Sequence, residues 1–167
     1  MLMLKRAAAL MIGGLLLLQL SCLTAGEPPV DKFTVESLRG RVVWMAEAMA
    51  RLHGAKSVPE AAERTLALET GDGQLHPLLE DVRGRAFRVD ERLRRMDVEL
   101  LVRRYPRTPV LQVVAVYEIT PQGKFEIDYC CDVCAIAMFE LKACECCQGE
   151  TELRRRRVFE PSTPPKP

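Results

Sequence analysis

Alternating apolar and polar residues predict a strand-rich domain over residues 30–121. Runs of β-branched and other apolar residues, separated by glycine, proline and charged clusters, give five predicted strands, at 38–44, 65–70, 74–79, 97–105 and 110–119. The last run is almost continuously apolar, so we expect it to be buried on both of its faces. Gly71, Asp72 and Gly73 supply the turn of a hairpin between the second and third strands.

Helices are expected in the connections between these strands. Residues 45–52 carry methionines and a leucine at helical spacing, which predicts a helix directly after the first strand. Ser57, with a glutamate three residues later, has the form of a capping box and predicts a second short helix, 60–64. The segment 85–95 is expected to form a loop and a short helix, with Asp90 as its cap.

The order of these elements resembles that of an OB-fold barrel. The resemblance rests on four segments, which read RGRVVW, LALETGDGQLHPLLED, GRAFRVDERLRRMDVELLVRR and VLQVVAVYEI. They are similar to the opening strand, the hairpin, the helix with its following strand and the closing strand of small exported bacterial OB-like domains. The resemblance implies a mainly β fold, an OB-like β-barrel with short helical inserts, over 30–121. No glycine interrupts the strand 97–105, so the sharp coiling of such a barrel has to arise at another position.

The N-terminus predicts export. Lys5 and Arg6 precede the apolar run 7–20, which is too short for a comfortable membrane span and is typical of a secretory signal peptide, 1–26. The mature protein is then periplasmic or extracellular and has no transmembrane span. Cys22 leaves a lipoprotein alternative open, in which this cysteine carries a lipid anchor.

Charge argues against a nucleic-acid-binding protein. The chain has 24 basic and 23 acidic residues, and loss of residues 1–26, with two basic residues and no acid, leaves a formal charge of −1. The arginines at 94–95, 103–104 and 154–157 could line a phosphate-binding stripe, so OB-type nucleic-acid or small-ligand binding is kept as a second alternative. Two observations favour a non-enzymatic protein. His53 and His76 are isolated in the sequence, and no nucleophile is recognisable together with a base that would activate it.

Six of the seven cysteines fall between residues 130 and 147. Cys131, Cys134, Cys144 and Cys147 have the spacing C-x2-C-x9-C-x2-C, which allows two knuckles to present four sulfurs to one tetrahedral metal ion. Short strands are expected on both sides, at 124–129 and 151–158, and the tail 159–167 is proline-rich and expected to be disordered.

The segment CDVCAIAMFELKACECCQG resembles a compact zinc ribbon, and 122–158 is expected to form such a module. The resemblance implies zinc as the cofactor, bound by Cys131, Cys134, Cys144 and Cys147, with the flanking strands paired as a hairpin. In zinc ribbons a glycine with positive φ commonly follows the second cysteine of a knuckle. Here Gln148 stands between that cysteine and Gly149.

Cys130 and Cys146 are left over, as a disulfide pair or as auxiliary thiols. Zinc with four thiolates, a disulfide framework suited to an oxidising compartment, and a redox-active or other soft-metal centre all remain open. We expect an exported, non-enzymatic zinc-binding module with a structural or protein-interaction role, whose partner is a protein of the cell envelope. The alternative is a thiol–disulfide redox or metal-handling protein that uses the C-x-x-C pairs.

Overall fold

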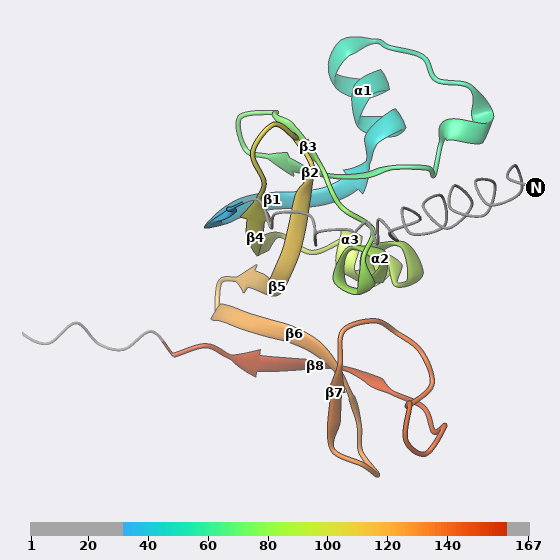
Figure 1. Cartoon of the computed structure of the whole chain (residues 1–167), viewed down its shortest axis with the longest axis vertical. Coiled ribbons are helices and arrows are strands. Elements are labelled where there is room, and N and C mark those ends of the chain that lie inside the picture. The colour runs from blue at the N-terminus through green and yellow to red at the C-terminus, as the bar shows by residue number, and fades with distance from the viewer. Residues whose placement is uncertain (1–31, 160–167) are drawn as a thin grey trace, which may run out of the picture. The chain divides into compact units, whose positions relative to one another are not determined.

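A computed structural model describes residues 32–159 of the chain (Figure 1). The predicted signal peptide 1–26, with Cys22, lies outside the described residues, as does the tail from residue 160 onward. None of the helices formed by residues 32–159 is long and apolar enough to cross a membrane.

The described residues form a mainly β fold, an antiparallel sheet of eight strands in the order β3-β2-β1-β4-β5-β6-β7, with β8 paired to β6. The strands are β1 Thr34–Trp44, β2 Leu66–Thr70, β3 Leu75–Pro77, β4 Val98–Arg104, β5 Leu111–Thr120, β6 Gly123–Cys131, β7 Ile136–Met138 and β8 Glu152–Arg157. All the strands predicted from the sequence are therefore present, with small differences at their ends, and β7 is an additional short strand within the cysteine segment.

Helices occupy the expected connections. They are α1 Met45–His53 after the first strand, the 3-10 turn η1 Pro59–Ala61, α2 Val82–Val89 and α3 Glu91–Arg94. The loop expected at the start of 85–95 was wrong, because residues 85–89 belong to α2, which Asp81 caps by accepting from the N–H groups of Arg83 and Gly84. Asp90 accepts a hydrogen bond from the backbone N–H of Arg92 and caps α3, as predicted. The predicted capping box was wrong, because η1 starts after Val58 with no side-chain cap, and Pro59 supplies the fixed φ that starts the turn.

The main core lies between the first five strands and α2–α3. Its fully buried members come from β1, β2, β4, β5, α2 and α3 and include Val42, Leu66, Leu68, Phe87, Leu93, Leu100, Val102 and Leu111. Burial on both faces of β5 was a wrong prediction. Leu111 and Val113 are buried, whereas Gln112, Val114 and much of the second half of the strand are partly exposed. The apolar residues on the outer face of β5 therefore lie on a partly exposed face of the sheet and do not belong to a second core.

Two close contacts join the strands of the main core. The segment after β3 reaches the start of β5, where Leu78 and Leu111 form a parallel bridge and the Leu79 N–H donates to the Leu111 carbonyl at 2.8 Å. At Gly40 the backbones of β1 and β2 approach so closely that a Cβ would lie 2.0 Å from the carbonyl oxygen of Glu69. This close approach of β1 and β2 therefore requires a glycine at position 40.

The strand β6 connects this core to the cysteine segment. Its first residues pair with β5 and its last three with β7, while β8 runs along the opposite edge from Phe125 to Cys130. The strands on either side of the cysteines thus pair antiparallel, and the Val158 N–H extends the pairing by donating to the Lys124 carbonyl at 2.9 Å. Cys131 is the last residue of β6, so the first knuckle starts directly from the sheet.

Candidate metal centre

Four cysteine sulfurs converge at the end of β6. The Sγ atoms of Cys131, Cys134, Cys144 and Cys147 all lie within 4.8 Å of one another. The Cys131 and Cys147 sulfurs, from different knuckles, are 3.4 Å apart. Cys131 and Cys144 are buried, Cys134 is half-buried and Cys147 is exposed, so the cluster has a buried floor and an open edge.

The two knuckles share one backbone conformation. The Ala135 N–H donates to the Cys131 carbonyl at 2.7 Å, and the Gln148 N–H donates to the Cys144 carbonyl at 2.9 Å. Each knuckle ends with a residue in the left-handed region, Ala135 at φ 53° and Gln148 at φ 59°. Neither is a glycine, and such a conformation costs an ordinary residue roughly 1 kcal/mol. Two independent segments of the chain adopt the same strained turn, and in both the turn brings its pair of sulfurs to the cluster.

Gly149 has a different role from the one that the ribbon resemblance suggests. Gln148 takes the positive φ that a glycine commonly provides. A Cβ at Gly149 would lie 3.3 Å from the Cys147 sulfur, which is tighter than usual packing. The glycine therefore leaves space beside a sulfur, and its carbonyl accepts the Cys144 N–H at 2.8 Å.

The surroundings of the sulfurs favour the thiolate of Cys144 over those of Cys131 and Cys134. Hydrogen bonds from the backbone N–H groups of Cys147 and Cys146 lower the pKa of Cys144 to about 7. A hydrogen bond from the Cys134 N–H lowers the pKa of Cys131, but burial and the neighbouring thiols of Cys147 and Cys144 outweigh it and raise this pKa overall. Hydrogen bonds with the thiols of Cys147 and Cys146 raise the pKa of Cys134. Crowded thiols cannot all ionise by themselves, and a bound cation is what would allow them to do so.

The donor set fits a soft or borderline metal ion. In a tetrahedral site with Zn–S bonds of about 2.3 Å the sulfurs are about 3.8 Å apart. The cluster, whose closest contact is 3.4 Å and whose sulfurs all lie within 4.8 Å of one another, needs only small side-chain adjustments to reach that spacing. Among residues 32–159 no histidine or carboxylate belongs to this group. Four thiols without an oxygen ligand suit zinc or Cu(I) better than magnesium or calcium.

Cys130 and Cys146 lie in different surroundings, and neither forms a disulfide within the described part of the chain. Successive residues of a strand point to opposite faces, so Cys130 points away from the cluster that Cys131 joins. The Cys130 sulfur is buried and lies 3.3 Å from the Nη1 of Arg154, whose other nitrogens hold Asp128 at 2.8 Å. Cys146 is exposed.

The connection between the two knuckles is fixed by α2. Arg85 donates to both carboxylate oxygens of Glu140, at 2.8 and 2.7 Å, and Glu140 is only 6% exposed. The guanidinium of Arg83 lies 3.5 Å from the centre of the Phe139 ring. No pattern in the sequence predicts these contacts, because an Arg–Glu pair separated by 55 positions leaves no local signal.

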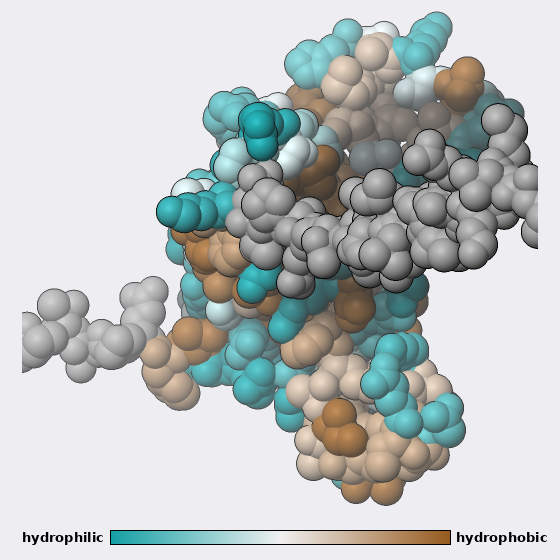
Figure 2. Space-filling view, viewed as in Figure 1, coloured by the Kyte–Doolittle hydropathy of each residue, from teal (hydrophilic) through white to brown (hydrophobic). Residues whose placement is uncertain are grey.

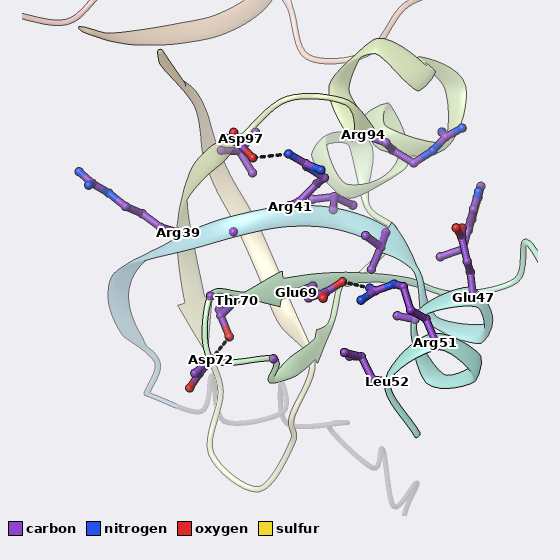
Figure 3. A pocket seen from close by; sticks show the side chains of 18 of the residues that line it. Arg39, Arg41, Glu47, Arg51, Leu52, Glu69, Thr70, Asp72, Arg94 and Asp97 are labelled. Carbon is purple, nitrogen blue, oxygen red and sulfur yellow. Dashed lines mark hydrogen bonds and ion pairs between the residues drawn. The ribbon is translucent and has the colours of Figure 1, made fainter. Parts of the chain in front are cut away.

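A separate groove of about 1030 Å³ lies along β1, α1 and the β2–β3 turn (Figure 3). Three of its arginines are paired with acids, Arg39 with Glu99, Arg41 with Asp97 at 2.7 Å and Arg51 with Glu69, while Arg94 donates to backbone carbonyls. The arginines of the predicted phosphate stripe are engaged in a similar way, for example in the pairs Arg104–Glu36, Arg154–Asp128, Arg155–Glu118 and Arg156–Glu126. These pairs neutralise the stripe along most of its length.

No protein-family model matches this chain, and comparisons with curated proteins and with solved structures find no similar protein. The four-sulfur cluster is therefore the feature from which function has to be argued. His53 lies at the exposed end of α1 and His76 in β3, and neither belongs to the cluster.

Proposed function

We propose that this chain is an exported, non-enzymatic metal-binding protein whose metal is zinc, held by Cys131, Cys134, Cys144 and Cys147. One observation carries the proposal, namely that two knuckles of the same conformation bring four sulfurs within 4.8 Å of one another. Zinc fits because it accepts four thiolates in a tetrahedron and has no redox chemistry of its own. Export is inferred from the signal-peptide pattern of residues 1–26.

The role that we assign to the metal is structural. Between β6 and β8 only Met138, Glu140, Cys144 and Thr151 are buried, and β7 has three residues. A segment with so little buried apolar surface has a weak core of its own. Metal binding would supply the missing stability, because the free energy of binding to a site that forms only on folding is also free energy of folding.

For the fold, we propose an OB-like barrel formed by the first five strands, with a zinc-ribbon-like module after it. The strand order β3-β2-β1-β4-β5, the Leu78–Leu111 bridge and the position of α2 and α3 between β3 and β4 all support the barrel. The antiparallel pairing of β6 with β8 around the cysteines supports the ribbon.

For the partner, we propose a protein of the cell envelope. Val133 and Ile136, at the first knuckle, are 83% and 41% exposed, and Figure 2 shows a mostly pale-brown surface at the end of the molecule that carries β7. Apolar side chains grouped on an otherwise polar protein favour a protein partner. The ion-paired arginines and the charge of the mature chain argue against nucleic acid.

Native mass spectrometry of the protein from its exported compartment, with thiol counting and elemental analysis, tests the proposal. We expect one zinc per chain, and we expect the same zinc content in Cys130→Ser but not in Cys144→Ser. A chain that carries no metal and has its cysteines in disulfides would refute the zinc site.

The second candidate is thiol–disulfide exchange, favoured by the 3.4 Å contact between the Cys131 and Cys147 sulfurs. The redox pair would then span the two knuckles instead of lying within one C-x-x-C motif. A metal-free protein with one readily reduced disulfide between these two residues would support this candidate over zinc.

A further inference from the structure

We propose that the outer edge of β8 is a docking site for an extended, acidic segment of a partner protein, which adds to the sheet as a further strand. This inference goes beyond the proposed function, because it concerns a surface other than the cysteine cluster and needs no bound metal. It also assigns a chemistry to the partner, namely an extended chain that carries carboxylates at alternate positions.

The strand β8 lies at an edge of the sheet. All six of its residues pair with β6, in a register without a shift. No strand formed by residues 32–159 pairs with its other edge (Figure 1). The segment contains neither proline nor glycine, the residues that commonly interrupt an edge strand. Its regular backbone can therefore accept a further strand.

The direction of the backbone groups follows from one hydrogen bond. The Val158 N–H donates to the carbonyl of Lys124 in β6 at 2.9 Å, so it points toward β6. Backbone groups of an antiparallel strand alternate in direction, and the N–H groups of Arg154 and Arg156 therefore also point toward β6. The residues whose N–H and C=O groups point away from β6 are Leu153, Arg155 and Arg157.

The surface along this edge is basic. Four of the six residues of β8 are arginines. The acids that pair with them lie further inside, since the side chains of Asp128 and Glu118 are 1% and 13% exposed, whereas that of Arg155 is 53% exposed. In the described part of the chain no carboxylate pairs with Arg157, whose Nη2 donates to a backbone carbonyl at 3.0 Å. Solvent at this edge therefore meets mainly guanidinium groups.

Charge selects the strand that can be added. Because the arginines are consecutive, antiparallel pairing of β8 with the β8 of a second copy would place arginines opposite arginines, which is destabilising. Arg155 and Arg157 are two positions apart and lie on one face of the strand. They therefore fit a strand with carboxylates two positions apart, because opposite charges on neighbouring strands attract each other.

The probe for this site is a labelled peptide of about seven residues, the usual length of a strand, in which glutamate and valine alternate. Its binding to the full chain is measured by fluorescence anisotropy. One control peptide has lysine in place of glutamate. The other has proline in place of valine, which keeps the carboxylates but removes backbone donors. We expect the glutamate–valine peptide to bind about ten-fold more tightly than either control, or better.

Amide hydrogen exchange shows whether the peptide adds as a strand. On binding, the amides of Leu153, Arg155 and Arg157 should gain protection, because they point toward the added strand. The amides of Arg154 and Arg156 should change little, because they already face β6. A bound peptide that leaves the exchange of the outward amides unchanged would overturn the inference.

The variant Arg157→Glu reverses one charge at this edge and should weaken peptide binding about ten-fold. Arg95→Glu is the matched control, since it changes the net charge equally at a position on α3 that is 72% exposed, and it should leave binding unchanged. Protection of the Arg154 and Arg156 amides in Arg157→Glu checks that β8 still pairs with β6.

Three further results would refute the docking site. The first is a proline-containing peptide, or a single-stranded oligonucleotide, that binds as tightly as the glutamate–valine peptide, because attraction between charges alone would then explain the binding. The second is Arg157→Glu binding equal to that of wild type while β8 remains paired. The third is a dimer of the free chain in which the outward amides of β8 are already protected.

Discussion

Arg85 on α2 donates hydrogen bonds to both carboxylate oxygens of Glu140, which lies between the two cysteine knuckles. Glu140 is almost fully buried, whereas the side chain of Arg85 is 52% exposed. A buried carboxylate needs a charged partner, so this pair fixes the loop between the knuckles against the helix that covers the main core.

The first prediction concerns this pair. Arg85→Ala leaves the Glu140 carboxylate buried without its partner and should lower the free energy of unfolding by about 2 kcal/mol, measured by urea denaturation. Glu140→Gln, which removes the buried charge, should cost less. Arg95→Ala is the control, since the Arg95–Glu91 pair is 72% and 63% exposed and should contribute less than about 1 kcal/mol. Equal costs for Arg85→Ala and Arg95→Ala would contradict the assignment.

Metal removal should loosen the cysteine segment and leave the main core folded. On chelation at neutral pH we expect the amides of residues 132–151 to lose protection in hydrogen exchange, because few of their side chains are buried. The amides of Val42, Leu68 and Leu100 should keep theirs, since these residues lie in the core cluster. Unchanged protection of 132–151 after complete loss of the metal would refute a structural role for it.

Asp90 should make the protein sensitive to acid. Burial alone would raise the pKa of Asp90, but hydrogen bonds from Arg92 and from the Tyr129 hydroxyl outweigh it and hold the pKa below its ordinary value. A carboxylate with a depressed pKa in the folded state contributes stability that is fully present above its unfolded pKa of about 3.9. That contribution is lost as the pH falls through the folded pKa.

Acid titration of Asp90→Asn tests this dependence. The variant should be less stable than wild type near neutral pH, and the difference should shrink as the pH falls below about 4. Thermal unfolding of the two proteins across this range gives the comparison. A difference that stays constant down to the lowest pH would show that Asp90 acts through packing and not through its charge.

Gly40 should tolerate no side chain. A Cβ there would lie 2.0 Å from the Glu69 carbonyl oxygen, so Gly40→Ala must push β1 and β2 apart and should cost about 3 kcal/mol or more. Gly71→Ala is the matched control, because a Cβ at Gly71 would meet nothing within 4 Å. Thermal unfolding of both variants provides the measurement, and a stable Gly40→Ala protein would contradict the close approach.

Much of the fold could be predicted from local pattern. Alternation of apolar residues located the strands of the main core and β6, and the helical spacing of 45–52 located α1. Burial on both faces of β5 could not be judged, because an apolar run has the same pattern whether one face is covered or two. The capping-box prediction was wrong because the proline after Val58 fixes the φ that starts the turn, and no side chain caps it.

The sequence by itself determined the composition of the cysteine cluster, since the spacing of two C-x-x-C pairs sets which four sulfurs two knuckles can offer to one centre. Only the tertiary structure decided what surrounds the cluster and where Cys130 lies. Cys130 is buried on the opposite face of β6 with its sulfur 3.3 Å from Arg154, and Glu140 between the knuckles is held by Arg85. Both arrangements depend on residues that are distant in the chain and meet only after folding.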